Sequence, residues 1–206
     1  SVLWYFGPVF LSARCFAFRD AAHYYYPLFQ WSAGRWAAGE IPLWNPQENC
    51  GVPVLADATS SIFYPGKLLF ALPLEFPLQY KLYVVGHILL AASMAFRLAR
   101  HWNASILAAG LCALSYAFGG NVLFQYCNVV YMVGAAWLPA ALLAADRMLI
   151  DHRFRSALIL GMILALMVLG GDPQMAYNAA LLVTVAGPRL RIGETRKCRK
   201  EQMVTG

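Results

Sequence analysis

The chain has 206 residues, of which 60% are hydrophobic and only 13% are charged, about half the charged fraction of an ordinary soluble domain. So few charges cannot supply the polar shell that a soluble core of this size needs, which excludes a soluble domain. The formal net charge of +6 comes without a basic groove carrying interleaved aromatic residues, so no nucleic-acid partner is expected. We therefore expect an all-α polytopic membrane protein.

An apolar segment from Val2 to Phe18 opens the chain. Its length is about the minimum of roughly 17 residues that can cross a bilayer as a helix. We expect residues 1–18 to form a first transmembrane span. Because the chain starts with Ser1 inside this apolar run, we expect the span to be truncated and the sequence to be a fragment.

Residues 19–80 are expected to form a large loop outside the membrane, because aromatic residues, prolines, glycines and acids interrupt every apolar run. Pro27 suits the first turn of a helix and Gly39 suits its end, which predicts a short helix from Tyr26 to Ala38. The aromatic content of this helix predicts a place at the membrane interface. Arg35 lies within its apolar arc, where the side chain can either snorkel toward lipid head groups or bind a phosphate.

Residues 81–188 are expected to form a bundle of about five transmembrane helices. The apolar segments that predict them are Leu82–Phe96, Ala104–Phe118, Val129–Ala145, Ala157–Leu169 and Met175–Ala186. Several are shorter than the roughly 20 residues wanted, so they must tilt, recruit flanking residues or pack inside the bundle. With the first span, the prediction is about six transmembrane helices.

Cations are clustered in alternate connections, as the positive-inside rule requires. Six of the 16 Lys and Arg residues lie in the tail 189–206, between Arg189 and Lys200. The cationic residues that follow the second and fourth spans are Arg97, Arg100, His101, Arg147, Arg153 and Arg155. These connections and the tail are predicted to be cytoplasmic. Whether the tail belongs to the native protein is left open. The loop 19–80 and the turn 170–174 are then external.

Two acids on the predicted external side are candidates for chemistry. Asp20 lies at the outer end of the first span, directly before the short helix, where a carboxylate can act as a general base. A surface ion pair with its neighbour Arg19, without catalytic meaning, is the alternative. Asp172, in the turn between the last two spans, can contact substrate or cap the helix that follows.

His87 is an ionisable residue inside a predicted span, which makes it a candidate for function. We favour the other interpretation, a neutral histidine hydrogen-bonded between helices. The five cysteines form no CxxC pair and no two histidines have ligand spacing, so no metal site is predicted and the cofactor stays unknown.

Five short motifs follow one another along the chain. They are Asp20–Pro27, Gly39–Pro46, Gly51–Pro53, Tyr64–Pro65 and Gly171–Gln174. Together they resemble the N-terminal part of bacterial YfhO-type membrane proteins, which are similar to GT-C-type glycosyltransferases. The resemblance covers the chain up to about Ala186, and it is the order of the motifs that makes it specific.

The resemblance implies a multi-pass enzyme of the bacterial cytoplasmic membrane that takes a sugar from a polyprenyl-phosphate carrier. The sugar is transferred, with inversion, to a cell-envelope acceptor on the outer face. Asp20 matches the family's first-loop acid, whose role is to orient or deprotonate the acceptor hydroxyl. The candidate substrate-binding residues are Arg19, His23, Arg35 and Lys67, together with Asp172 and Gln174 in the external turn. The family often carries His where this chain has Asp172.

Two other functions stay open. A transporter or lipid-handling protein without covalent chemistry would use the long loop for binding, and broken helices or charges buried at mid-membrane would favour it. A purely structural membrane subunit would tolerate neutral substitution of all the loop acids together. The resemblance ranks the glycosyltransferase first.

Overall fold

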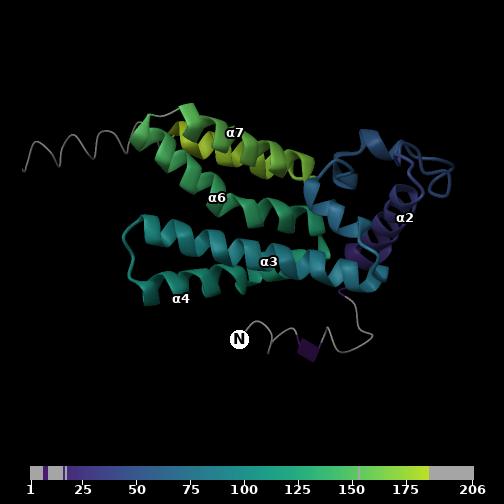
Figure 1. Cartoon of the computed structure of the whole chain (residues 1–206), viewed down its shortest axis with the longest axis horizontal. Coiled ribbons are helices and arrows are strands. Elements are labelled where there is room, and N and C mark those ends of the chain that lie inside the picture. The colour runs from purple at the N-terminus through teal and green to yellow at the C-terminus, as the bar shows by residue number, and fades with distance from the viewer. Residues whose placement is uncertain (1–6, 9–15, 17, 153, 186–206) are drawn as a thin grey trace, which may run out of the picture.

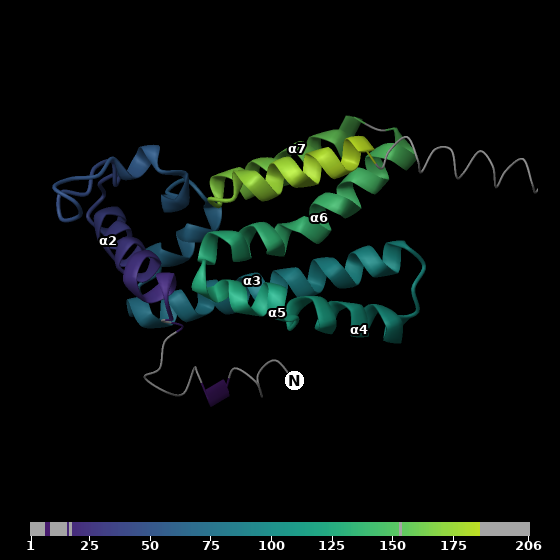
Figure 2. The same ribbon diagram turned by 180° about the vertical axis from the view of Figure 1, so that it is seen from behind.

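The computed structural model describes residues 7–8, 16, 18–152 and 154–185. Within these residues every regular element is a helix, and strand-like pairing is limited to one bridge between Asn45 and Val52. Long helices lie side by side in a bundle, and short helices and loops cover one end of it (Figures 1 and 2). The predicted first span and the basic tail lie outside the described residues, apart from a few positions in the span.

The bundle contains α3 (Phe76–His101), α4 (Ile106–Ala117), α5 (Gly120–Leu123), α6 (Val129–Asp151), α7 (Phe154–Leu169) and a helix over residues 173–185. A short 3-10 helix, η5 (Phe124–Cys127), joins α5 to α6. α3 packs against both α4 and α6, and α6 packs against α7. Each apolar segment predicted in this region is therefore a helix.

Two helices, α3 and α6, are long and apolar enough to cross a membrane. α4 and the segment Gly120–Cys127 meet at a bend of 41° and make a third span if they are taken together. α7 is apolar but has only 16 residues. The helices thus indicate a membrane protein with two or three spans by length and composition, and the count of about six stays a prediction.

α3 begins at Phe76, well before the apolar segment that was predicted from Leu82. Pro77 lies in its first turn, where the missing N–H costs no helical hydrogen bond. Gln79 is buried there although it is polar, because its Nε2 donates to the carbonyl of Leu72 at 2.7 Å. Hydropathy alone misses this turn, since its polar side chains are satisfied by the preceding loop.

The capping segment, residues 18–75, covers one end of the bundle. It contains a π-helix, η1 (Ala21–Tyr25), then α2 (Tyr26–Ala37) and the 3-10 helices η2 (Val54–Ala56), η3 (Ala58–Ser60) and η4 (Pro65–Ala71). The short helix predicted from Pro27 and Gly39 is confirmed to within one residue. α2 buries Leu28 and Phe29 in the protein core, and its place at a membrane interface stays a prediction.

A chain of hydrogen bonds fixes the capping segment to the bundle. Trp137 Nε1 on α6 donates to the Tyr64 hydroxyl at 2.9 Å, and that hydroxyl lies 2.8 Å from His87 Nε2 on α3. His87 Nδ1 donates to the Tyr83 carbonyl at 2.7 Å, because a carbonyl can only accept. Nε2 of the neutral ring is then free to accept the Tyr64 proton. His87 is hydrogen-bonded inside the protein, as expected, but its partners are Tyr83 of its own helix and the loop residue Tyr64, so it does not link two helices.

Pro139 interrupts α6 without leaving a carbonyl unpaired. A proline has no N–H to bond with the carbonyl four residues earlier, which here belongs to Ala135. The Tyr116 hydroxyl, from α4, donates to that carbonyl at 2.8 Å. Packing between α4 and α6 therefore includes a hydrogen bond that replaces one lost inside the helix.

Replacing Tyr116 with Phe should lower the free energy of unfolding by about 1–3 kcal/mol, because it leaves the Ala135 carbonyl unpaired. In a Pro139→Ala background the restored backbone N–H can bond that carbonyl, so the same change should cost less. Thermal unfolding of the wild type, both single variants and the double variant in detergent measures the difference. Equal losses in the two backgrounds would contradict the compensation.

Candidate functional site

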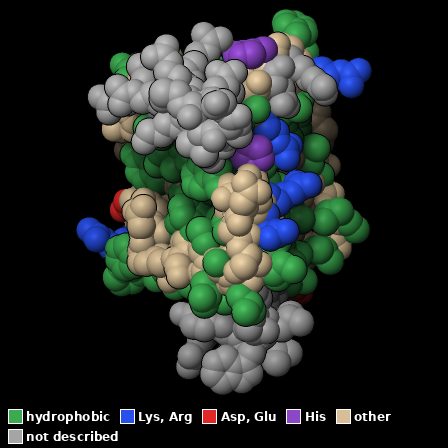
Figure 3. Space-filling view, turned by 90° about the vertical axis from the view of Figure 1, so that its left-hand side faces the viewer, with side chains coloured by type: hydrophobic (Ala, Val, Ile, Leu, Met, Phe, Trp, Pro, Cys, Tyr) green, Lys and Arg blue, Asp and Glu red, His purple; other side chains and the backbone are tan. Residues whose placement is uncertain are grey.

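The charged side chains separate toward the two ends of the bundle. We call the end covered by the capping segment and the turn 170–172 the loop end (Figure 1). The arginine end holds the α3–α4 and α6–α7 connections, and Figure 3 shows Lys, Arg and His side chains gathered there. Arg97, Arg100 and Arg147 lie in the final turns of α3 and α6, which run toward that end. Four of the described Lys and Arg residues lie at each end, and the ends differ in their acids, with six at the loop end against Asp146 and Asp151 at the arginine end. The two ends therefore differ in net charge.

Asp57, which was not among the candidates predicted from the sequence, is a highly connected carboxylate at the loop end. Tyr24 of η1 donates to its Oδ2 at 2.7 Å, and the backbone N–H of Thr59 donates to Oδ1 at 2.9 Å. Burial would raise the pKa of Asp57, but hydrogen bonds from Tyr24 and Thr59 and the charge of Lys67 outweigh it and lower the pKa. Burial and the bond to Asp57 raise the pKa of Tyr24 to about 12. Asp57 is thus a charged anchor that joins η1 to η3.

The ammonium group of Lys67 is buried inside the capping segment. It donates to the Ser60 carbonyl and lies 3.4 Å from the centre of the Phe29 ring. Burial lowers the pKa of Lys67 well below its ordinary value, and the negative charge of Asp57 opposes that shift. Lys67 therefore holds η3 and α2 together, and its expected contact with a phosphate stays a prediction.

An apolar groove of about 330 Å³ opens beside Lys67. Its walls include Trp36 of α2, and also Phe63 and Leu68. The last two side chains are 55% and 73% exposed. Large apolar side chains left exposed around a groove mark contact with lipid or a ligand. The groove can therefore take an apolar chain close to the polar groups of the capping segment.

Asp172 is 2% exposed and lies in the turn before the helix 173–185. Its Oδ1 accepts from the backbone N–H of Met175 at 2.9 Å, so the predicted helix cap is confirmed. Its Oδ2 is buried and has no hydrogen-bond partner among the described residues. Burial raises the pKa of Asp172, and the bond from Met175 opposes that shift. A buried oxygen without a partner costs stability, which favours a functional reason for keeping it.

Gly134 leaves room for the Asp172 carboxylate, and Gly171 lets its turn approach the Asp57 cluster, by which we mean Asp57 with Tyr24 and Thr59. Gly134 of α6 faces the Asp172 carboxylate so closely that a Cβ at this position would collide with it. Gly171 has a φ of +94°, in the left-handed region, and a Cβ there would lie 3.0 Å from the Ala58 carbonyl. Because Ala58 follows Asp57 directly, the two carboxylates lie on neighbouring segments of the loop end.

Asp20, Arg19 and His23 are exposed at the start of η1. Arg19 has a φ of 54°, a left-handed conformation that costs a non-glycine residue about 1–2 kcal/mol. Burial raises the pKa of Tyr25, the last residue of this π-helix, and the charges of Asp20 and Asp57 add to that shift. Asp20 lies at the start of the helix that carries Tyr24, but among the described residues no hydrogen bond or ion pair joins Asp20 to Asp57.

The remaining candidate residues, Arg35 and Gln174, are exposed. The Arg35 guanidinium lies 2.6 Å from a carboxylate oxygen of Glu40, and both side chains are about half exposed. Such a pair contributes less than about 1 kcal/mol to stability. Within the described residues, neither Arg35 nor Gln174 is joined to the Asp57 cluster by a hydrogen bond or ion pair.

The raised pKa of Asp172 predicts how stability depends on pH. The protonated carboxyl contributes stability below the ordinary pKa of 3.8, and this is lost as the pH rises through the higher folded pKa. Asp172→Asn keeps an acceptor for Met175 and removes the charge, so its melting temperature should fall less than that of the wild type over this range. Asp172→Ala should lose about 1 kcal/mol with the cap at pH 3.8, and because it also lacks the buried charge its deficit should shrink as the pH rises.

Thermal unfolding in detergent, at a series of pH values upward from 3.8, compares the three proteins. The other acids titrate alike in all of them, so only the difference between wild type and variant is interpreted. If the melting temperature of Asp172→Asn changed with pH as much as that of the wild type, burial of the Asp172 carboxylate would not destabilise the folded protein.

Comparison of the chain with protein-family models, with curated proteins and with solved structures finds no match. Among the described residues, no group of three or more His, Cys, Asp or Glu side chains is arranged to hold a metal ion. The geometry of the loop end itself, with its anchored acid, its exposed acid and its apolar groove, therefore carries the functional interpretation.

Proposed function

We propose that the protein is an integral membrane glycosyltransferase of the GT-C-like, YfhO type. It transfers a sugar from a polyprenyl-phosphate carrier to an acceptor hydroxyl on the extracytoplasmic face of the bacterial cytoplasmic membrane. One observation carries this proposal. An exposed carboxylate, Asp20, lies at the start of η1, the helix whose Tyr24 holds Asp57, and the same capping segment carries an apolar groove.

Asp20 is the general base in this proposal. Its side chain caps no backbone N–H of η1 and is exposed, so the carboxylate is free to meet an acceptor hydroxyl. Asp57 is poorly suited to the role, because Tyr24 and Thr59 already hold both of its oxygens. The strained backbone of Arg19 and the π-helix that follows are features that cluster at functional sites.

The groups available for the leaving phosphate are the cationic or donor side chains next to Asp20. Arg19 precedes it directly, and His23 lies one turn later on the exposed side of η1. A developing phosphate charge is stabilised by such donors when they are held in place before reaction. The apolar groove beside Lys67 takes a later part of the polyprenyl chain, because its Trp36 wall lies at the opposite end of the continuous η1–α2 helix from Arg19 and His23.

The proposed reaction is a single displacement. The acceptor oxygen gives its proton to Asp20 and attacks the anomeric carbon, forming the new glycosidic bond. The bond between that carbon and the phosphate oxygen breaks, and polyprenyl phosphate leaves with the electron pair. Attack opposite to the leaving group inverts the anomeric configuration.

The membrane arrangement is part of the proposal. We place the loop end outside and the arginine end in the cytoplasm, with about six spans and α2 at the interface. The support is that cations outnumber acids at the arginine end, where Figure 3 shows Lys, Arg and His side chains, and the positive-inside rule assigns such an end to the cytoplasm.

A transporter or lipid-handling protein is the second candidate, and the bend of 41° between α4 and α5 favours it. Broken helices of this kind bind ions or substrates in many transporters, through charged or polar groups near the break. The bend at Gly119 has two polar amides nearby, Asn121 and Gln125, but no charged residue within α4 or the segment Gly120–Cys127. We therefore rank this candidate below the glycosyltransferase.

Asp20→Asn should lower sugar transfer by about 10²- to 10⁴-fold, the usual contribution of a general base. The assay follows a radiolabelled hexose from polyprenyl-phosphate hexoses to endogenous acceptors in membranes that contain the protein. Glu40→Gln is the matched control, because it removes an exposed acid of the same segment that pairs only with Arg35. Its activity should stay within about twofold of the wild type, as expected for a surface pair.

Wild-type transfer by Asp20→Asn would remove Asp20 from the mechanism. Equal losses in the Asp20 and Glu40 variants would point to the charge of the segment as a whole, and this would also contradict the assigned role.

A further inference from the structure

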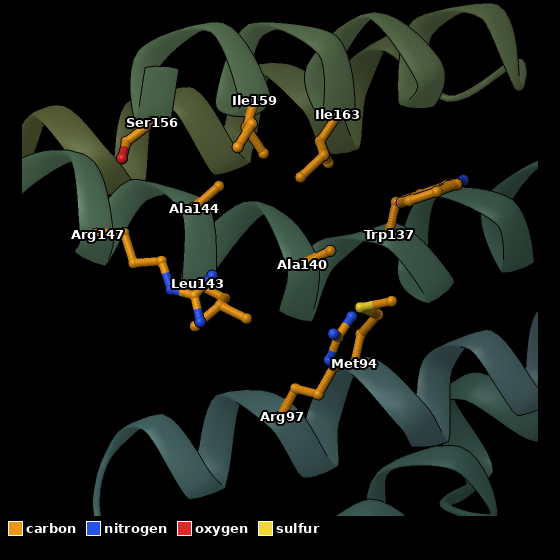
Figure 4. A pocket seen from close by; sticks show the side chains of 10 residues that line it. All are labelled: Met94, Arg97, Trp137, Ala140, Leu143, Ala144, Arg147, Ser156, Ile159 and Ile163. Atoms are coloured by element: carbon orange, nitrogen blue, oxygen red, sulfur yellow. The ribbon is translucent and has the colours of Figure 1, made fainter. Parts of the chain in front are cut away.

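A second groove lies between α3, α6 and α7, toward the arginine end (Figure 4). Its volume is about 200 Å³. Two small residues of α6, Ala140 and Ala144, form its floor between the neighbouring helices, and Trp137 lies at one end (Figure 4). The remaining apolar lining residues are Met94 of α3, Leu143 of α6, and Ile159 and Ile163 of α7.

Two arginines supply the charge of this groove. Arg97 of α3 and Arg147 of α6 line it, and Figure 4 shows both guanidinium groups turned into the space between the two helices. Neither has an ion pair or side-chain hydrogen bond with any described residue, and no acid is among the lining residues. The acid beside Arg147, Asp146, is already bound by Trp102 Nε1 at 2.9 Å and His101 Nε2 at 3.2 Å.

The groove therefore combines an apolar channel with two cations that have no counter-charge. Both arginines lie about one turn before the ends of helices long enough to span a membrane, and the ends of such helices meet the lipid head groups. A volume of about 200 Å³ corresponds to roughly seven water molecules at about 30 Å³ each. It can hold part of one hydrocarbon chain, and it is too small for a whole lipid.

We propose that this groove binds one anionic phospholipid of the surrounding leaflet. Its acyl chain lies over Ala140 and Ala144, and its phosphate is held by Arg97 and Arg147. Guanidinium groups bind phosphate oxygens through paired, charge-assisted hydrogen bonds. Basic pockets between transmembrane helices select anionic head groups in this way. The site is at the opposite end of the bundle from Asp20 and does not depend on the proposed glycosyl transfer.

The experiment is native mass spectrometry of the delipidated full chain in detergent, titrated with phosphatidylglycerol or with phosphatidylcholine of the same acyl chains. The wild type should bind phosphatidylglycerol more tightly than phosphatidylcholine. Arg97→Gln or Arg147→Gln should weaken phosphatidylglycerol binding by about fivefold each, and the double variant by about twenty-five-fold. Phosphatidylcholine binding should change little.

Arg155→Gln is the matched control, because it removes an exposed cation of α7 at the same end that does not line the groove. It should bind phosphatidylglycerol like the wild type. Ile159→Trp, at a half-exposed position of the wall, narrows the groove without changing charge and should weaken both lipids. Melting temperatures measured without lipid identify any variant that fails to fold. Arg97→Gln, Arg147→Gln and Ile159→Trp each test the groove separately, so a folding failure of one leaves the other two as tests.

Equal affinity of the wild type for the two lipids would overturn the proposal. So would a loss in Arg155→Gln as large as in Arg97→Gln, which would mean that net charge alone attracts the lipid. Binding of polyprenyl phosphate through Arg97 and Arg147, without binding of phosphatidylglycerol, would overturn the assigned occupant.

Discussion

The hydroxyl of Tyr64 is the constraint on which the loop end depends. It comes from the capping segment, yet it accepts from Trp137 of α6 and bonds with His87 of α3. The Tyr64 hydroxyl, Trp137 Nε1 and His87 Nε2 satisfy one another's hydrogen bonds. A shift of the capping segment would leave several of these groups buried without a partner. The same contacts fix where η3 lies, and hence where Asp57 meets the turn that carries Asp172.

The few charged residues of the chain are divided between two tasks. At the loop end two acids are held by hydrogen bonds, Asp57 on both oxygens and Asp172 through one oxygen as a helix cap, while Asp20 stays exposed. At the arginine end the cations lie close to helix C-termini, where the helix dipole favours positive charge. A hydrophobic chain can thus carry two chemically different ends on one bundle.

Local signals in the sequence predict the parts of the structure that depend on neighbouring residues. Pro27 and Gly39 locate α2, and the position of Asp172 before a helix predicts its cap. Contacts between distant segments are invisible to such signals. Tyr24 and Asp57 are 33 positions apart, and nothing near Lys67 in the chain indicates that its ammonium group would be buried against an aromatic ring. Asp57 was therefore missed, and Lys67 was selected as a phosphate contact although its ammonium group is buried inside the capping segment.

The central claim is that the loop end faces outward and the arginine end faces the cytoplasm. It is tested by labelling with a membrane-impermeant maleimide in cells, using one variant in which the exposed Cys50 is the sole cysteine. A second variant carries Arg155→Cys as its sole cysteine. The account predicts that Cys50 reacts in cells with an intact cytoplasmic membrane and that position 155 reacts only after permeabilisation. The opposite pattern, or labelling of both positions from the same side, would contradict it.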